Sequence, residues 1–205
     1  MAYRIVVVGT SWGGLHALTV LVRGLPADFA LPLAVVQHRS KDSDGLLAQI
    51  LQDETELRVS EVEDKEPIES GHVYVAPPDY HLLVDGAYFS LTVDPPVRFS
   101  RPSIDVTFIS AASACGAATV GVVLTGANED GALGLRRIAE RGGHAVVQDP
   151  ASAEIATMPA AARRAVPSAM VLRLEEMSQY LTELAASACQ ARARHAAPGE
   201  LGKRP

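Results

Sequence analysis

The sequence predicts an α/β protein with a three-layer, doubly wound and mostly parallel sheet and one inserted antiparallel hairpin. Short apolar runs rich in β-branched residues alternate with segments of helical period along the 205 residues, which is typical of a parallel sheet covered by helices. The first run leads through a glycine-rich turn directly into a helical segment. Alternating residues on both sides of Asp85-Gly86 predict the hairpin.

The first strand–turn–helix unit carries the strongest functional signal. Ile5–Val8 is an unbroken apolar run, so we expect a strand buried on both faces. The turn 9–13 reads Gly-Thr-Ser-Trp-Gly, and an apolar face with helical spacing follows at Leu15, Leu18, Val22 and Leu25. In this context a Gly-x-Ser-x-Gly turn presents a serine as a nucleophile. Ser11 is therefore a candidate nucleophile, and the alternative is that it only caps the first helix.

The remaining segments continue the alternation. We expect strands at 33–37, 58–61, 73–76, 120–124, 145–148 and 170–172, with the hairpin at 81–91 and a loop at 95–101. We expect helices at 46–51 and 133–140, and one from Pro102-Ser103 to 114 with Ser103 as its cap. Another helix is expected to open at Pro159, and the last helix is expected to begin with residues 177–184.

The last helix is expected to continue through an alanine-rich run to His195, where Pro198 and Gly199 would end it. The residues after it are expected to form a mobile tail. We therefore expect one catalytic domain over residues 1–186, and a helix extension with a tail over 187–205.

Composition excludes several classes of protein. The chain is 48% hydrophobic and has no apolar run near the ~20 residues of a membrane span and no secretory signal, so we expect a cytoplasmic protein without membrane insertion. The net charge of −6 and the absence of a basic patch argue against nucleic acid. Cys115 and Cys189 make neither a disulfide framework nor a zinc site, and Cys115 is expected in the core.

Two nucleotide-binding alternatives fit the glycine turn poorly. Gly9, Gly13 and Gly14 do not have the Gly-x-Gly-x-x-Gly spacing, and Gln37-His38 ends the second strand where a ribose-binding acid would be expected. No lysine follows the glycines, as a phosphate-binding loop requires.

Other strand ends supply partners for Ser11. His38 follows the second strand, and Glu129 and Asp130 follow the strand at 120–124. Because the ligand site of a doubly wound sheet lies beyond the carboxyl ends of its strands, a nucleophile, a base and an orienting carboxylate project from one edge. The spacing favours Asp130 over Glu129 only modestly, and Asp130 has helix capping as its alternative role.

The order Ser, His, Asp along the chain differs from the Ser, Asp, His order of α/β-hydrolases. No His-Gly-Gly-Gly segment for an oxyanion is present either. Both facts argue against an ordinary lipase or esterase fold.

At this point the sequence resembles the catalytic domain of the chemotaxis protein-glutamate methylesterase family, CheB. The similarity extends in family order from about residue 4 to about residue 184, in these segments: 8–14, 36–38, 71–77, 101–106, 121–126 with Asp130-Gly131, Gln148-Asp149 with Ser152, Met158-Pro159 and Ala162. The resemblance implies a catalytic triad of Ser11, His38 and Asp130, and thus favours Asp130 over Glu129. It also implies the fold expected above.

The resemblance implies hydrolysis of glutamate γ-methyl esters on a chemoreceptor-like protein through an acyl-enzyme, with glutamine deamidation as a related activity and no cofactor or metal. Backbone N–H groups near Trp12 and Ala127 are the candidate oxyanion donors. A receptor methyltransferase or a separate regulator is a candidate partner. An esterase or amidase acting on another acyl substrate, and a non-catalytic binding module, remain alternatives.

Three departures from the family pattern stand out. The first strand begins near residue 4, so we expect a stand-alone form without the receiver domain that usually precedes this domain. Trp12 stands where the enterobacterial form has threonine, and Ala127-Asn128 replaces a methionine-glycine pair. The substrate-facing rim is therefore expected to differ.

Three further polar residues have structural alternatives. Arg101 is a candidate contact for an anionic substrate, although its place before a helix start slightly favours tying down a loop. His72 opens a strand and His81 opens the hairpin, so both are expected to be structural.

Overall fold

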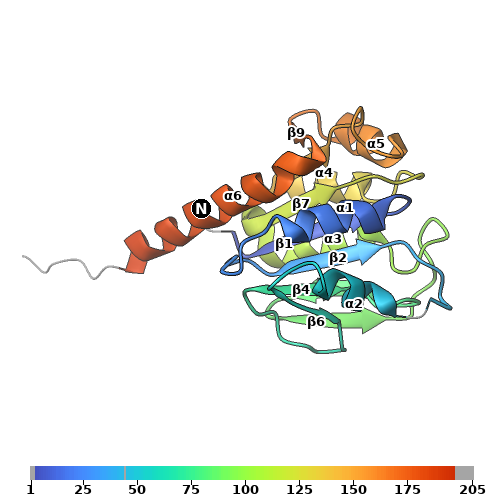
Figure 1. Cartoon of the computed structure of the whole chain (residues 1–205), viewed down its shortest axis with the longest axis horizontal. Coiled ribbons are helices and arrows are strands. Elements are labelled where there is room, and N and C mark those ends of the chain that lie inside the picture. The colour runs from blue at the N-terminus through green and yellow to red at the C-terminus, as the bar shows by residue number, and fades with distance from the viewer. Residues whose placement is uncertain (1–2, 44, 197–205) are drawn as a thin grey trace, which may run out of the picture.

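The computed structural model describes residues 3–43 and 45–196 of the chain. Seven strands form one parallel sheet in the order β3-β4-β2-β1-β7-β8-β9, and β5 and β6 form a separate antiparallel hairpin (Figure 1). The strands are β1 (Ile5–Thr10), β2 (Leu33–Gln37), β3 (Arg58–Glu61), β4 (His72–Val75), β5 (His81–Asp85), β6 (Tyr88–Thr92), β7 (Thr119–Val123), β8 (His144–Gln148) and β9 (Met170–Leu172). The predicted fold class is confirmed, and the large sheet is parallel throughout.

In the described part of the chain five α-helices connect strands, and a sixth follows β9. They are α1 (Gly14–Arg23), α2 (Leu46–Gln52), α3 (Ile104–Cys115), α4 (Ala132–Glu140), α5 (Thr157–Ala165) and, after β9, α6 (Leu174–Ala196). A 3-10 turn at Gly116–Ala118 joins α3 to β7.

The order of the strands places a crevice beside the end of β1. Along β1, Val7 pairs with Ala34 of β2 on one side and with Gly121 of β7 on the other. From β1 the chain forms β2, β3 and β4 on one side of the sheet and later β7, β8 and β9 on the other, so β1 and β7 flank the point where the strand order reverses. Loops diverge at such a point and leave a crevice at the carboxyl ends of the strands. The loop after β1 begins with Ser11.

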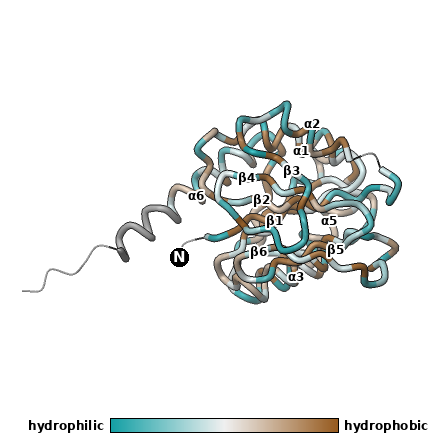
Figure 2. The backbone as a smooth tube through the Cα atoms, turned by 90° about the horizontal axis from the view of Figure 1, so that it is seen from below, coloured by the Kyte–Doolittle hydropathy of each residue, from teal (hydrophilic) through white to brown (hydrophobic). Residues whose placement is uncertain are grey.

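Alternate residues of β1 enter two different cores. Val6 and Val8 pack under α1, α2 and α6, whereas Ile5 and Val7 pack under α3, α4, α5 and the hairpin. This division follows from the period of two in a strand, and it explains why β1 reads as an unbroken apolar run. Figure 2 shows the apolar segments running through the middle of the molecule, with hydrophilic turns at its edges.

Several local expectations were wrong. Pro159 is the third residue of α5 and does not open it. Leu15 is 46% exposed although it was expected on the apolar face of α1, because that face is formed by Ala17, Leu18, Leu21 and Val22. Cys115, at the end of α3, is only half-buried, although it packs against the core as expected.

The C-terminal helix begins earlier than expected, at Leu174, and continues to Ala196 as expected. It passes position 187 without a break, and the division of the chain into 1–186 and 187–205 stays a prediction. The expected tail, including Pro198 and Gly199, lies outside the described residues. Within the described ranges no helix is long and apolar enough to cross a membrane.

Candidate active site

The ends of β1, β2 and β7 bring Ser11, His38 and the loop before Asp130 to one edge of the sheet. Strand pairing continues just past β1 and β2, since the His38 N–H donates to the Thr10 carbonyl at 3.1 Å. On the other side the Ser11 N–H donates to the Thr125 carbonyl at 3.0 Å. The backbone of Ser11 is therefore fixed by the two loops that supply the other site residues.

Ser11 does not cap the first helix. Gly13 is the N-cap of α1, with a φ of 76°, and α1 has no side-chain capping bond. The capping alternative for Ser11 is therefore wrong. The site also needs glycine nearby, because a Cβ at Gly126 would lie 3.0 Å from Ser11 Cβ and 2.6 Å from Met158 Cε. Close backbone approach thus places the loop after β7 directly against the serine.

Gln37 links the two residues of the expected nucleophile–base pair. Its Nε2 donates to the Ser11 carbonyl at 2.8 Å and to the His38 carbonyl at 2.9 Å. The other end of this amide lies over α1, where a Cβ on Gly14 would be 1.9 Å from Gln37 Oε1. Sequence reasoning assigned Gln37 no role. The available signal was a polar residue at the end of an otherwise apolar, buried strand.

His38 and Asp130 form a close and buried pair. His38 Nε2 lies 2.8 Å from Asp130 Oδ2, with side-chain exposures of 10% and 0%. A carboxylate only accepts hydrogen bonds, so Nε2 carries the proton that it donates to Asp130. In the neutral ring Nδ1 is then the nitrogen with the free electron pair. No hydrogen bond joins Ser11 Oγ to the ring in the part of the chain that the structure describes, and such bonds often form only with substrate bound.

Asp130 also accepts hydrogen bonds from the start of α3. Ile104 N–H donates to Asp130 Oδ2 at 2.7 Å, and Asp105 N–H and Ser103 Oγ donate to Oδ1 at 3.0 and 3.1 Å. Ser103 is the N-cap residue of α3 as expected, but its side chain makes no capping bond and instead donates to Asp130. Asp130 is thus a helix cap as anticipated, but mainly for α3 rather than for the helix that follows it.

Glu129 lies apart from this network. Its carboxylate is half-exposed and pairs with Arg164 at 3.0 Å and with Arg98 at 3.9 Å. Of the two neighbouring acids, Asp130 is therefore the one that contacts His38.

Asp105 mirrors Asp130 at the next helix. Its Oδ1 accepts hydrogen bonds from Gly131 N–H at 2.9 Å and from Gly134 N–H at 2.7 Å, at the start of α4. Each aspartate thus caps the helix that begins beside the other. Sequence reasoning missed this role, because an acidic residue in a first helical turn is ordinary and nothing along the chain marks the contact between α3 and α4.

The two buried aspartates have opposite pKa shifts. Burial raises the pKa of Asp105 to about 6. Hydrogen bonds from the Gly134 and Gly131 N–H groups act to lower this pKa, whereas the neighbouring Asp130 charge acts to raise it further. Burial also acts to raise the pKa of Asp130, but hydrogen bonds from the His38 ring and from backbone N–H groups of α3 lower it below the ordinary value. At neutral pH Asp130 is therefore ionised and able to orient His38.

The candidate oxyanion donors are neighbours in sequence of Ser11 and of Gly126, which lies against Ser11. The backbone N–H groups of Trp12 and Ala127 have no hydrogen-bond partner among the described residues. Ala127 follows Gly126, which contacts Ser11, and the Trp12 side chain is 66% exposed. Both N–H groups are thus available to a ligand.

Arg101 makes hydrogen bonds within the chain. Its guanidinium donates to Asp79 Oδ1, at 3.0 Å from Nε, and to the carbonyls of Val93 and Asp94 at 2.7 and 3.1 Å. These bonds hold the loop before α3. Arg101 also lines a hollow of about 280 Å³ beside His38, together with Arg39, Lys41 and Phe99.

His72 and His81, which were expected to be structural, have contacts of that kind. His81 Nδ1 accepts from Ser103 N–H at 3.2 Å, and His72 Nε2 bonds the Ser60 hydroxyl at 2.8 Å. Burial lowers the pKa of His72 to about 4, with the Arg58 charge adding to this effect.

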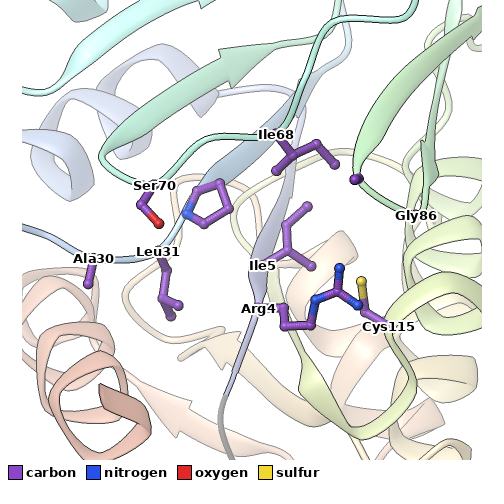
Figure 3. A pocket seen from close by; sticks show the side chains of 10 residues that line it. Arg4, Ile5, Ala30, Leu31, Ile68, Ser70, Gly86 and Cys115 are labelled. Atoms are coloured by element: carbon purple, nitrogen blue, oxygen red, sulfur yellow. The ribbon is translucent and has the colours of Figure 1, made fainter. Parts of the chain in front are cut away.

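A second hollow, of about 180 Å³, lies at the opposite end of β1 (Figure 3). Arg4, Ile5, Leu31, Ile68 and Cys115 line it, and none of the site residues does. Among the side chains that the structure describes, within residues 3–43 and 45–187, no cluster of metal-ligating groups occurs.

The chain is similar to known proteins of one family. The family model described as CheB methylesterase matches residues 6–181. A Leptospira interrogans chain, whose name gives methylesterase and glutaminase activities provisionally, is 46% identical over 90% of this chain and 96% of its own length. A protein-glutamate methylesterase/protein-glutamine glutaminase of Anaeromyxobacter dehalogenans is 40% identical over 88% of this chain and 53% of its own length.

Among solved structures, the CheB methylesterase catalytic domain of Thermotoga maritima superimposes with a TM-score of 0.86 at 32% identity. The match covers 90% of this chain and all of that domain. From its sequence and from its fold, this chain belongs to the CheB methylesterase family.

Proposed function

We propose that this chain hydrolyses glutamate γ-methyl esters on methylated chemoreceptors through an acyl intermediate on Ser11. The observation that carries this proposal is the buried 2.8 Å pair of His38 and Asp130 at the strand end beside Ser11. The names of the relatives from Leptospira and Anaeromyxobacter support the substrate and the reaction.

The reaction begins with attack of Ser11 Oγ on the ester carbonyl carbon. His38 Nδ1 takes the hydroxyl proton, since Nε2 keeps its own proton in the bond to Asp130. The tetrahedral intermediate collapses, the C–O bond to the methoxy group breaks, and the His38 proton leaves with it as methanol. Water then attacks the glutamyl-serine ester by the same proton path and releases the glutamate carboxylate.

The Trp12 and Ala127 N–H groups stabilise the negative oxygen of each tetrahedral intermediate. Both lie beside Ser11 without a partner among the described residues, so they are ready to donate before substrate binds. Donors that are positioned in advance cost no reorganisation during the reaction.

Glutamine deamidation is a second candidate activity, favoured by the glutaminase in the relatives' names. The same acyl intermediate forms when ammonia leaves in place of methanol. The exposed Trp12 and the Ala127-Asn128 rim favour a third candidate, an ester of another acyl group. A receptor methyltransferase or a separate regulator is the partner that we propose besides the receptor.

Methanol release from a chemoreceptor carrying labelled methyl esters tests the proposal. We expect release by the wild-type chain and none above background by Ser11→Ala, which removes one half-buried side-chain oxygen and little packing. A small ester such as p-nitrophenyl acetate is assayed in parallel. Turnover of the small ester without methanol release would move the substrate to another acyl group, and release by Ser11→Ala would contradict the Ser11 mechanism.

A further inference from the structure

The ring of His38 is held from both nitrogens in this structure. Nε2 bonds the Asp130 carboxylate, and Nδ1 lies 3.4 Å from Nδ2 of Asn128. Nδ1 is the nitrogen that must accept the Ser11 proton in the proposed mechanism. The electron pair of the base is therefore directed at an amide of the same chain and not at the nucleophile.

The orientation of the Asn128 amide is fixed by a donor that cannot be reversed. Asn128 Oδ1 accepts the Asp130 backbone N–H at 3.0 Å. A backbone N–H only donates, so the oxygen must face it and the NH₂ group must face His38. The residue that orients the imidazole thus also orients, through its backbone N–H, the amide that faces Nδ1 of the ring.

Asn128 lies near the surface of the molecule. It is half-buried between the exposed Ala127 and Glu129, on the loop whose Gly126 lies against Ser11. The 3.4 Å contact with the ring is long for a hydrogen bond, so it is weak compared with the 2.8 Å bond to Asp130. The contact between the Asn128 amide and the ring is therefore weak enough for a substrate that enters beside Ser11 to break it.

We propose that the Asn128 amide is a resting-state block on the base, displaced when substrate binds, and so a positioning residue that sets the apparent affinity. This inference rests on the proposed function. A protein whose competent state is only partly populated binds substrate more weakly by that fraction. Removal of the block should lower KM without lowering kcat.

Asn128→Ala is the direct test, with methanol release and fluorophosphonate labelling of Ser11 as the two readouts. A weak hydrogen bond corresponds to a rise of about 2- to 10-fold in kcat/KM and in the labelling rate, with kcat maintained. A side chain that only supports the loop would not lower KM on removal.

Asn128→Asp is the matched variant. It keeps an oxygen for the Asp130 N–H but places an acceptor against Nδ1, which holds a proton there, so kcat/KM should fall below that of wild type. Glu129→Gln, on the same loop, should match wild type.

An unchanged or lower kcat/KM in Asn128→Ala would overturn the inference, and a lower kcat would instead make the amide a transition-state donor. The Ser11→Ala variant distinguishes a failure of this inference from a failure of the proposed function. If it is inert while Asn128→Ala gains nothing, only this inference fails. If Ser11→Ala is still active, the proposed function itself fails.

Discussion

The starts of α3 and α4 are built alike, yet only one of them belongs to the reaction. Asp130 caps α3 and Asp105 caps α4, and both carboxylates are buried beside each other. Asp130 also faces His38, and the pKa of Asp130 is lowered, whereas that of Asp105 is raised to about 6. A carboxylate becomes part of a catalytic site here through a second contact, made in addition to its structural one.

The largest expected difference between the two aspartates is in turnover. Asp130→Asn presents an amide N–H to His38 Nε2 and favours the wrong tautomer, so kcat should fall by up to about 10⁴-fold, as for the corresponding change in serine proteases. Asp105→Asn keeps an oxygen for Gly131 and Gly134 and should stay within about 10-fold of wild type. Steady-state methanol release measures both.

Glu129→Gln is the control for that experiment, because within the described residues Glu129 pairs with two exposed arginines and not with His38. Equal losses in Asp130→Asn and Asp105→Asn would remove the distinction between the two caps, and a larger loss in Glu129→Gln would move the orienting role to Glu129.

The next effect is on the pH dependence of stability. The pKa of Asp105 is raised from 3.8 to about 6 in the folded chain, so between these values the folded state binds more protons than the unfolded state. The contribution of Asp105 is therefore complete below about pH 4 and is lost as the pH rises through 6, by up to about 3 kcal/mol.

Asp105→Asn removes this titration and should unfold at higher denaturant than wild type at pH 7, with a smaller advantage at pH 4. The contribution of Asp130 to stability has the opposite pH dependence. Because the pKa of Asp130 is lowered, its contribution is present above pH 3.8 and is lost as the pH falls below that value. Urea unfolding of both proteins at the two pH values measures the difference. If the difference in unfolding free energy between wild type and Asp105→Asn were the same at pH 4 and pH 7, ionisation of Asp105 would not destabilise the folded chain.

The smallest effect concerns capping itself. Asp105→Ala leaves the Gly131 and Gly134 N–H groups without their acceptor and should cost about 1–2 kcal/mol in the free energy of unfolding. Asp105→Asn keeps that acceptor and is the matched control. A loss shared by both variants would show that charge, not the hydrogen bonds, stabilises α4.

The fold and the residues at the strand ends could be predicted from the sequence, because the spacing of apolar residues and the glycine-rich turns are visible within short stretches of chain. Ile5–Val8 and the turn at Ser11 are local signals of this kind. The reciprocal caps were not predictable, since they depend on how α3 packs against α4. Gln37 and Asn128 show the same limit: their partners are 26 and 90 residues away along the chain.

We propose that His38 and Asp130 make Ser11 nucleophilic, whereas Asp105 only stabilises the start of α4. The rate at which a fluorophosphonate modifies Ser11, followed by mass spectrometry of the peptide, tests it most directly. We expect modification at Ser11 in wild type and at a similar rate in Asp105→Asn, and a rate at least about 100-fold lower in Asp130→Asn. Modification at another residue, or equal rates in wild type and Asp130→Asn, would contradict the claim.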